Sequence, residues 1–213
     1  MSHLKRISIE KSWPLPRKGT KYVLKSYPGQ SMSMPLGIIL RDILKITSRR
    51  KETKALLHGK EVIVNGKING EEKSPIGLFD VVSIPKLKKN FVMTLNEKGK
   101  IYLEEIDDKD SHSKICKVVN MTVLKKGVRQ INCLDGRNFI SKEKVSINDS
   151  VVVGFSNGKI SKVITFKSGA EIFVMGGAHM GEKGKITEKD DKIKVSIHGK
   201  NFEIQEKNII VTK

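Results

Sequence analysis

The sequence predicts an α+β fold that is mostly β. All six prolines lie at or before Pro85, so strands in the rest of the chain keep every backbone donor. Beyond that point, apolar and polar residues alternate between turn signals such as Asp135-Gly136 and Asn157-Gly158, as in short strands. One stretch before Pro85 has helical spacing instead. We therefore expect four parts: a basic arm over residues 1–33, a two-helix and hairpin module over 34–88, a central β domain over 89–168 and a small β barrel over 169–213.

The first part reads as an irregular basic arm. The only Trp and two of the three Tyr occur here among basic residues. Cationic side chains neutralise phosphates, and aromatic rings stack on unpaired bases. In the alternative reading, Trp13 fills a core and the lysines are merely solvated. The candidate RNA contacts of the arm are Lys5, Arg6, Trp13, Arg17, Lys18, Lys21 and Lys25.

Two short helices should follow the arm. Pro35 suits a first helical position. The apolar residues after it recur at intervals of three and four, which predicts an amphipathic helix. Thr47 or Ser48 should end this helix and cap the next one, which should stop at Gly59 in a left-handed conformation. The apolar stripe consists of Leu36, Ile39, Leu40, Ile43 and Leu44.

The second helix should begin with a cluster of positive charge. Arg49, Arg50 and Lys51 stand at its start, and Lys54 shares a face with Arg50 at the i, i+4 spacing. Cations at a helix N-terminus oppose the helix dipole. This arrangement favours an external anion that offsets the repulsion, although a merely solvated face remains the alternative.

The remaining segments should be β-rich. Asn65-Gly66 between β-branched residues predicts a tight hairpin, and residues 80–84 should form a closing strand. We expect the acidic segment 104–110 to face solvent or a basic protein neighbour. Further strands are expected near residues 91–95, 100–104, 116–123, 129–134, 150–155 and 159–166.

The last 45 residues predict another small barrel. Ile193, Val195 and Ile197 alternate with polar residues, as in a strand with one buried face. Glycines at 177, 181 and 184 let a loop turn sharply and approach another surface. His179, between these glycines, is a candidate RNA contact. The segment lacks the Gly-Lys-Ser/Thr ending of a phosphate loop.

Charge points to the class of partner. The 213 residues carry 41 Lys and Arg against 23 Asp and Glu, a net charge of +18. Such self-repulsion favours a polyanionic partner. Nucleic acid fits better than an anionic membrane, because prolines and glycines interrupt the basic amphipathic helix that membrane binding needs. The sequence predicts no membrane span and no secretory leader.

No pattern of catalytic residues is visible. Two Cys and five dispersed His match no zinc-ligand spacing, and no nucleophile stands near a general base in a known motif. We therefore expect no enzyme, no metal, no cofactor and no small-molecule substrate.

The assembled motifs resemble small-subunit ribosomal protein four of the archaeal and eukaryotic type along nearly the whole chain. His3-Leu4-Lys5-Arg6 with Trp13 looks like the opening of that family. Residues 48–67 are similar to the RNA-binding module named after bacterial ribosomal protein four. Lys114–Val118 and Gly158-Lys159-Ile160 look like the family's central domain, and residues 176–186 resemble a KOW motif, which in this family forms an SH3-like barrel.

This resemblance implies a cytoplasmic ribosomal protein that binds small-subunit rRNA near its 5′ region, beside other ribosomal proteins. The implied contacts of the RNA-binding module are Arg49, Arg50, Lys51, Lys54 and Lys67; those of the KOW loop are His179, Lys183 and Lys185.

Two other functions stay open at the level of sequence. The helix and hairpin module also occurs in RNA-modifying enzymes, for which this chain would be an accessory subunit. KOW modules also occur in transcription-elongation factors. The resemblance in motif order favours the ribosomal reading, with backbone and shape contacts to rRNA.

Overall fold

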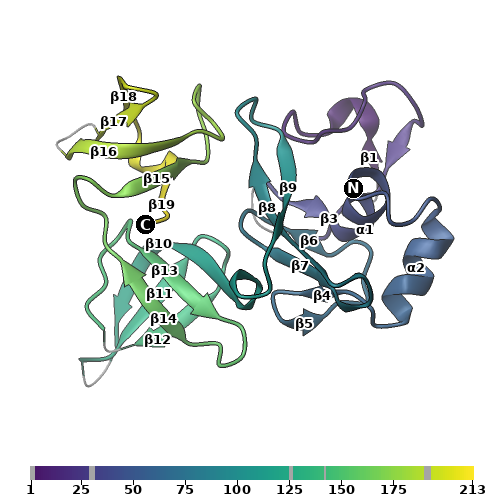
Figure 1. The fold of residues 1–213 in the computed structure, drawn as a ribbon, viewed down its shortest axis with the longest axis horizontal. Helices are drawn as coiled ribbons and strands as arrows, with labels where there is room; N and C mark the ends of the chain where they lie inside the picture. Colours follow the sequence, from purple (N-terminus) through teal and green to yellow (C-terminus); the bar gives the residue numbers. More distant parts are fainter. Residues whose placement is uncertain (1–2, 29–31, 125–126, 142, 190–192) are drawn as a thin grey trace. The chain divides into compact units, whose positions relative to one another are not determined.

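The computed structural model describes residues 3–28, 32–124, 127–141, 143–189 and 193–213. The chain forms two compact units. The first contains the chain up to Leu95 together with Lys100–His112, and the second contains Asn96–Gly99 and Ser113–Lys213. Both are built mainly from strands, as Figure 1 shows, and the few helices lie in the first unit or in single turns. The prediction of a mostly β fold is confirmed.

The first unit holds the predicted amphipathic helix. Strand β3 (Met34–Pro35) leads into α1 (Leu36–Ile38), which continues as the π-helix η2 (Ile39–Ile43). Leu36, Ile39 and Leu40 are fully buried, as the apolar stripe predicts. Pro35 lies one position earlier than we predicted, at the cap, where its fixed φ of −66° still leads into the helix.

The second helix, α2 (Arg50–His58), differs from the prediction at both ends. Neither Thr47 nor Ser48 caps it: the cap residue is Arg49, and the carboxylate of Glu52 accepts the backbone N–H groups of Ser48 (2.8 Å) and Arg49 (3.2 Å). These two hydrogen bonds lower the pKa of Glu52. Gly59 stays right-handed at φ −67°, and Lys60 takes the left-handed turn at φ 56°. A carboxylate inside the first turn therefore supplies the cap that we expected from a hydroxyl.

The first unit also contains a five-stranded sheet with the strand order β5-β4-β7-β8-β9. The Asn-Gly hairpin is confirmed: Asn65 and Gly66 have φ values of 50° and 76°. The Asn65 side chain also accepts the N–H of Val81 (3.0 Å) and donates to Asp80 (2.8 Å), which fastens the hairpin to the closing strand. The strands are β4 (Ile63–Val64), β5 (Lys67–Ile68), β7 (Val81–Ile84), β8 (Lys89–Leu95) and β9 (Ile101–Ile106), with β6 (Pro75–Ile76) paired to β3.

This sheet moves the predicted start of the central domain. We expected a boundary between residues 88 and 89. Strand β8 instead pairs with β7, with Val82 opposite Phe91, so β8 and β9 complete the first unit. Backbone pairing across a short turn, the 3-10 helix η3 (Pro85–Leu87), outweighs the boundary that Pro85 indicated.

The N-terminal segment, residues 3–28, is more ordered than an irregular arm. Strands β1 (Leu4–Lys5) and β2 (Tyr22–Val23) pair antiparallel around the 3-10 helix η1 (Arg6–Ser8). Ile9 and Trp13 are buried. Residues 1, 2 and 29–31 of the predicted arm lie outside the described residues.

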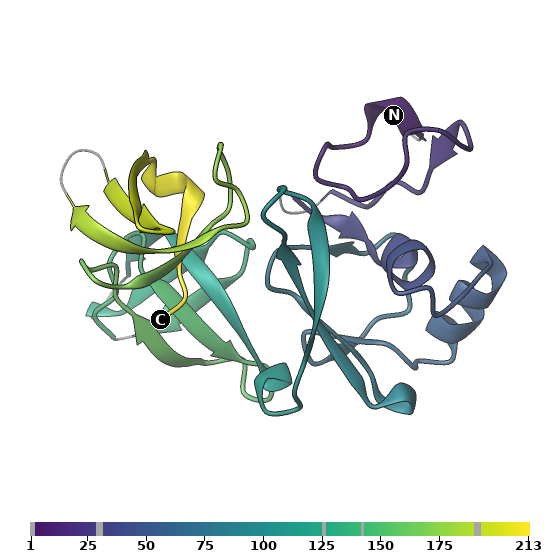
Figure 2. The same cartoon turned by 45° about the horizontal axis from the view of Figure 1, so that its top comes forward.

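The second unit contains two more five-stranded antiparallel sheets (Figures 1 and 2). The first has the order β12-β11-β10-β13-β14 and the second has the order β18-β17-β16-β15-β19. Each encloses its own apolar cluster, around Val118 and Val151 in one and around Ile172 and Val195 in the other. In the order of the chain the strands are β10 (Ser113–Val123), β11 (Arg129–Cys133), β12 (Asn138–Ser141), β13 (Ser150–Gly154), β14 (Ile160–Ile164), β15 (Glu171–Val174), β16 (Lys183–Lys189), β17 (Ile193–Ile197), β18 (Lys200–Ile204) and β19 (Ile209–Val211). The single turn η6 (Glu206–Asn208) precedes β19, and the single turn η4 (Asp110–His112), which precedes β10, still belongs to the first unit.

Candidate nucleic-acid interface

The basic start of α2 divides into two sets of side chains. All four cations are exposed, so the two sets, Arg49 with Lys51 and Arg50 with Lys54, differ in their contacts and not in their exposure. Arg50 and Lys54 lie on one face, as their spacing predicts, and both contact Glu72. The guanidinium of Arg50 binds both carboxylate oxygens of Glu72, one of them at 2.9 Å, and Lys54 Nζ lies 4.0 Å from Glu72 Oε1.

Glu72 supplies part of the countercharge that we expected from an outside anion. Its side chain is only 8% exposed. The hydrogen bonds from Arg50 lower the pKa of Glu72, and the same contact raises the pKa of Arg50. Arg50 is therefore committed to a carboxylate within the chain, which leaves Arg49 and Lys51 as the cations of this helix start best placed for an outside phosphate.

Sequence reasoning missed Glu72. The dipeptide Glu71-Glu72 carries no motif, and its contact with Arg50 spans 22 residues. Backbone hydrogen bonds bring it there, because Gly37 N donates to Glu72 O (2.8 Å) and Leu36 N donates to Ser74 O (2.9 Å). Only a prediction of this long-range pairing would have found the ion pair.

Lys67 lies at the start of β5, directly after the hairpin turn, and is exposed. The short β5 strand is an edge of the first sheet. A lysine on such an edge discourages pairing with another chain and also presents a charge to solvent.

The cations of the N-terminal segment play different parts. Lys5, Lys18 and Lys21 are exposed, as are Arg17 and Lys25. Arg6 instead organises the segment: Nε donates to Thr20 O (2.8 Å), Nη1 to Pro16 O (2.9 Å) and Nη2 to Thr20 Oγ1 (2.9 Å). All three acceptors are neutral, so these bonds orient the guanidinium without cancelling its charge.

The structure overturns the predicted RNA contact of Trp13. Its side chain is 5% exposed, which leaves no ring face for a base. Trp13 Nε1 is buried and has no hydrogen-bond partner, which is true of no other buried side-chain nitrogen or oxygen among the described residues. The indole contributes a large apolar area to the interior, and that burial outweighs its affinity for an RNA base.

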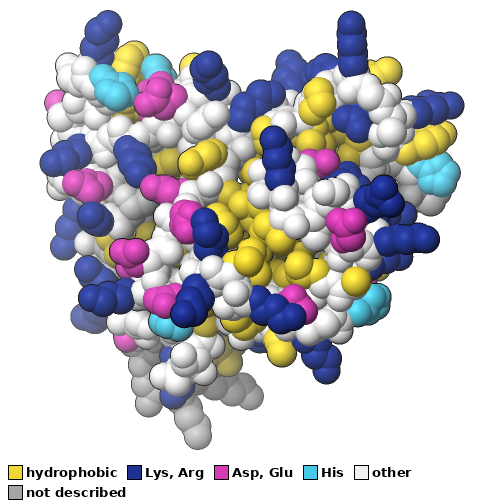
Figure 3. Space-filling model, turned by 45° about the vertical axis from the view of Figure 1, so that its right-hand side comes forward, with side chains coloured by type: hydrophobic (Ala, Val, Ile, Leu, Met, Phe, Trp, Pro, Cys, Tyr) yellow, Lys and Arg dark blue, Asp and Glu magenta, His cyan; other side chains and the backbone are white. Residues whose placement is uncertain are grey.

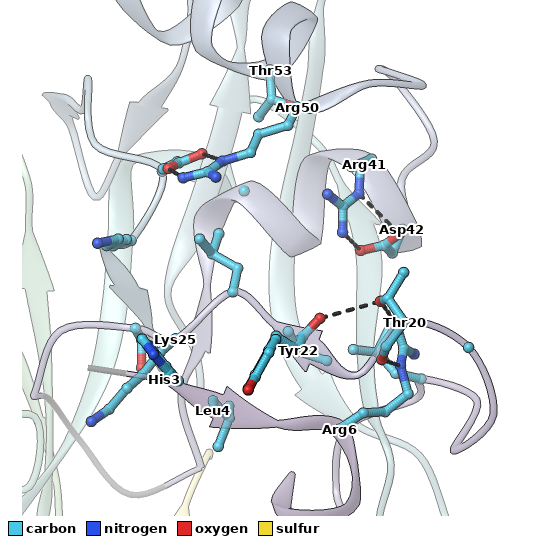
Figure 4. A pocket seen from close by; sticks show the side chains of 18 of the residues that line it. His3, Leu4, Arg6, Thr20, Tyr22, Lys25, Arg41, Asp42, Arg50 and Thr53 are labelled. Atoms are coloured by element: carbon cyan, nitrogen blue, oxygen red, sulfur yellow. Dashed lines mark hydrogen bonds and ion pairs between the residues drawn. The ribbon is translucent and has the colours of Figure 1, made fainter. Parts of the chain in front are cut away.

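A hollow of about 1230 Å³ lies between the N-terminal segment and the helices of the first unit. Figure 4 shows its labelled side chains, which come from the N-terminal segment (residues 3–25) and from η2 and α2. Arg41 binds Asp42 there, with Nη2 at 2.7 Å from Oδ2. Charged and aromatic side chains lining the hollow include Arg6, Lys18, Tyr22, Lys25, Tyr27, Arg41, Asp42, Arg50, Glu72 and Lys73.

The glycine-rich loop of the second unit has the predicted sharp turns. Gly177 and Gly181 have φ values of 98° and 92°. A Cβ on Gly184 would lie 2.7 Å from Ser196 O, so a close approach of two strands requires this glycine. His179 is held by a contact of Nδ1 with Glu182 (3.1 Å) and by packing on Phe202, with ring centroids 4.0 Å apart.

Lys183 and Lys185 follow this loop on β16, and both are exposed. They alternate along the strand with Gly184, so they point to the same side. The predicted cations Lys183 and Lys185 therefore lie together in the second unit. The predicted cations of α2 and of the N-terminal segment lie in the first unit. Figure 3 shows Lys and Arg side chains projecting over much of one face, with fewer carboxylates between them.

The described residues contain neither a membrane-spanning helix nor a metal cluster. No helix among them has the length and apolar character required to cross a bilayer. No group of three or more His, Cys, Asp or Glu within these ranges is arranged to hold a metal ion.

Comparison with known proteins gives one consistent family. The family model described as "Ribosomal family S4e" matches residues 87–160. "Small ribosomal subunit protein eS4" of Methanocella arvoryzae is 36% identical over 190 residues, which cover 88% of this chain and 80% of that protein. The protein of the same name from Methanothermobacter thermautotrophicus is 37% identical over 187 residues, 86% of this chain and 77% of that protein.

A solved structure agrees with these relatives. The crystal structure of the 30S ribosomal protein S4e from Thermoplasma acidophilum matches with a TM-score of 0.74 and 25% identity, covering 85% of this chain and 95% of that one. With more than 30% identity over more than two thirds of its relatives, this chain belongs to the ribosomal protein S4e family.

Proposed function

We propose that this chain is a structural component of the small ribosomal subunit that binds rRNA through contacts to the RNA backbone and through shape. The observation that carries the proposal is the exposed positive charge of the N-terminal segment and of the start of α2, in a member of a ribosomal protein family. Residues 1–60 carry 14 Lys and Arg against three acids. Cations in such numbers neutralise phosphates, and release of counterions drives the binding.

Backbone and shape contacts fit this surface better than base reading. The major groove of an RNA helix is deep and narrow, so side chains do not reach the base edges there. Exposed lysines and arginines on short elements can instead follow the phosphates. Lys183 and Lys185 in the second unit, on what we propose is a KOW-type SH3-like barrel, would add a second set of such contacts.

Neighbouring ribosomal proteins are the proposed protein partners. The exposed acidic residues Glu104, Glu105 and Asp107 repel phosphates, so this part of β9 and its following loop would face a basic protein instead. The ribosome, and with it the cytoplasm, is the expected location.

The two alternative functions have no support among the relatives. The named relatives are small-subunit ribosomal proteins, not elongation factors or subunits of modifying enzymes. The family is a structural ribosomal one, so the chain is not an enzyme.

Charge neutralisation on α2 and β5 tests the proposal. The variant Arg49→Gln, Lys51→Gln, Lys67→Gln removes three exposed cations and spares Arg50, which holds the buried Glu72. Filter binding to a transcript of the small-subunit rRNA 5′ region should show weaker affinity. The slope of log K against log salt should fall by about one for each phosphate that the variant no longer neutralises.

A matched variant provides the control. Lys86→Gln, Lys89→Gln, Lys109→Gln removes the same charge, but Lys86 and Lys89 are paired with Glu61 and Glu105, and Lys109 stands between aspartates. This control should bind the transcript nearly as the unchanged protein does. Equal weakening in both variants would contradict the assignment to α2 and β5. Absence of the unchanged protein from small subunits on sucrose gradients would contradict the function itself.

A further inference from the structure

The hollow of the first unit has walls that are tied to each other. The N-terminal segment is fastened to the rest of the unit by backbone hydrogen bonds from Tyr27 N to Lys73 O (2.9 Å) and from Ile101 N to Ser12 O (2.8 Å). Leu24 packs so closely on α1 that a Cβ at Gly37 would lie 2.9 Å from its Cδ2. A space bounded in this way is a preformed feature, and preformed sites bind with less loss of conformational entropy.

The charge inside the hollow is positive. Six cationic side chains line it against two carboxylates, and each carboxylate is bound by an arginine: Asp42 by Arg41 and Glu72 by Arg50. The charges of Arg6, Lys18 and Lys73 are therefore not balanced by these two carboxylates. Arg6 is held rigid by neutral oxygens at the same time.

Two half-exposed aromatic rings complete the lining. Tyr22 is 48% exposed and Tyr27 is 49% exposed. A cation already lies near each ring: Lys73, which lines the hollow, has its Nζ 5.9 Å from the Tyr27 centroid, and Lys21, which is outside the lining, has its Nζ 5.5 Å from the Tyr22 centroid. Ring and ammonium thus occur as pairs, and such a pair fits a base with its own phosphate.

From this arrangement we infer that the hollow receives an unpaired nucleotide of the bound RNA, with its base on Tyr22 or Tyr27 and its phosphates at the lysines. The inference rests on the proposed function and gives it a site that reads single-stranded RNA. Aromatic rings stack on unpaired bases regardless of sequence. The volume exceeds the roughly 300–1,000 Å³ of ordinary small-molecule pockets, so a nucleotide fits together with its flanking phosphates.

An acidic peptide is the other class of ligand for a positive hollow. Carboxylates would use the lysines but would gain little from exposed tyrosine rings. The rings therefore distinguish the two ligands, and the experiment is built on them.

Three alanine variants of the full chain test the inference. Tyr22→Ala and Tyr27→Ala each remove one ring of the hollow. Tyr102→Ala is the matched control, because Tyr102 lies on β9 in the same unit, is 54% exposed and does not line the hollow. Affinity is measured for the rRNA 5′-region transcript, for a six-nucleotide oligoadenylate and for hexaglutamate, and thermal melting of each variant checks that the fold is intact.

We expect the loss of a stacked base to weaken binding of the transcript at least about fivefold in Tyr22→Ala or Tyr27→Ala, and not in Tyr102→Ala. The oligoadenylate should show the same order of affinities. Phenylalanine at the affected position should restore binding, because the ring stacks without its hydroxyl. Hexaglutamate should bind all variants equally weakly.

The outcomes separate the inference from the proposed function. Transcript affinity that is equal in Tyr22→Ala, Tyr27→Ala and Tyr102→Ala overturns the inference and leaves the proposed function standing. Tight hexaglutamate binding that displaces the transcript from the hollow also overturns it, in favour of an acidic protein segment. Failure of the unchanged protein to bind the transcript overturns the proposed function instead. If Tyr22→Ala or Tyr27→Ala melts at a lower temperature than the unchanged protein, the transcript affinity of the phenylalanine variant at that position decides instead. Affinity equal to that of the unchanged protein supports stacking on the ring, and weakened affinity in a phenylalanine variant with unchanged melting overturns it.

Discussion

Two buried lysines of β10 illustrate how differently the same side chain can be accommodated. Lys114 Nζ forms an ion pair with Asp135 (3.0 Å), whose other contacts include the Cys116 thiol at 3.3 Å. Burial would raise the pKa of Asp135, but the Lys114 charge and the hydrogen bonds outweigh it and lower the pKa. Lys117 Nζ donates instead to the backbone carbonyl of Glu206, a neutral acceptor. Burial accordingly lowers the pKa of Lys117 to about 8.

The pKa of Lys117 predicts a stability change at alkaline pH. Between about pH 8 and its ordinary value of 10.5, the unfolded chain binds more protons at this residue than the folded one. The free energy of unfolding therefore rises with pH in that window. Below about pH 8 the Lys117 ammonium is charged in both states, and the destabilisation caused by its burial has its full size. Relative to Lys117→Met, the free energy of unfolding of the unchanged protein should increase by at least about 1 kcal/mol from pH 8 to 10.5.

Urea unfolding under reducing conditions at several pH values measures this difference. Lys162→Met is the control, since Lys162 lies on β14 and is exposed, so that water solvates its amine in both states. A difference between the unchanged protein and Lys117→Met that stays constant from pH 8 to 10.5 would show that the Lys117 amine is solvated in the native state.

The sequence predicted the basic and aromatic composition of the N-terminal segment better than it predicted the role of each residue in it. Trp13, Tyr22 and Tyr27 occur in one basic stretch, and the pattern alone does not decide which of the three rings stack on RNA and which fill a core. The structure buries the tryptophan and leaves both tyrosines half exposed. The segment meets β9 where Ile101 N donates to Ser12 O (2.8 Å) and meets α1 where Leu24 packs against Gly37, and no local pattern encodes either contact.

At the scale of elements, local signals were dependable and distant ones were not. The expected strands at 116–123 and 150–155 correspond to β10 and β13, because alternation and turn residues act within a few positions. The cap of α2 was assigned to the wrong residues because Glu52 competes with Thr47, whose hydroxyl instead bonds to Thr53 in the interior (2.8 Å). Strand β8 belongs to the first sheet because it pairs with β7, and Pro85, which lies between the two strands, had indicated an end of the unit there.

The contact between the N-terminal segment and α1 gives a prediction at this scale. Gly37→Ala would place a Cβ 2.9 Å from Leu24 and 3.2 Å from the backbone oxygen of Glu72. Overpacking of this kind costs roughly 1–3 kcal/mol, which exceeds the gain of up to about 1 kcal/mol from replacing glycine in a helix. We expect Gly37→Ala to lower the free energy of unfolding and to loosen the segment from the helix.

Chemical denaturation together with protease sensitivity of residues 3–28 checks this expectation. Gly70→Ala is the matched control, because a Cβ there meets nothing nearer than 3.8 Å and the glycine has no left-handed φ. It should change stability by less than about 1 kcal/mol. If Gly37→Ala proves as stable as Gly70→Ala, the segment has room to move and the hollow has no fixed wall.

For the whole molecule, charge was the property that the sequence predicted best. A net charge of +18 on 213 residues does not depend on the fold, and it indicated a polyanionic partner before any element was placed. The sequence could not show how much of this charge the chain balances for itself. Two arginines form ion pairs within the chain, Arg41 with Asp42 and Arg50 with Glu72, so part of the positive charge is already balanced.

The remaining repulsion predicts opposite effects of salt on the free and the RNA-bound protein. Screening shortens from about 10 Å at 0.1 M to about 3 Å at 1 M salt. In the free protein, less repulsion among exposed lysines should raise the unfolding temperature by about 2–4 °C for each 1 kcal/mol gained. In the complex, the same salt weakens phosphate contacts, so the stabilisation that RNA gives by mass action should shrink.

Calorimetry in KCl with and without the rRNA transcript tests this reversal of sign. Chloride is preferable to sulfate or phosphate, which stabilise proteins by exclusion from their surface. Each of the two compact units can give its own transition, and both should respond, because each carries a net charge of +9, from 21 Lys and Arg against 12 Asp and Glu in the first and 20 against 11 in the second. The Arg49→Gln, Lys51→Gln, Lys67→Gln variant should show a smaller salt response in both states, because three of the repelling and phosphate-binding charges are gone. If the unfolding temperature of the free protein falls as the KCl concentration rises, internal ion pairs contribute more to stability than repulsion between cations takes away. A polyanionic partner would then not be needed to offset that repulsion.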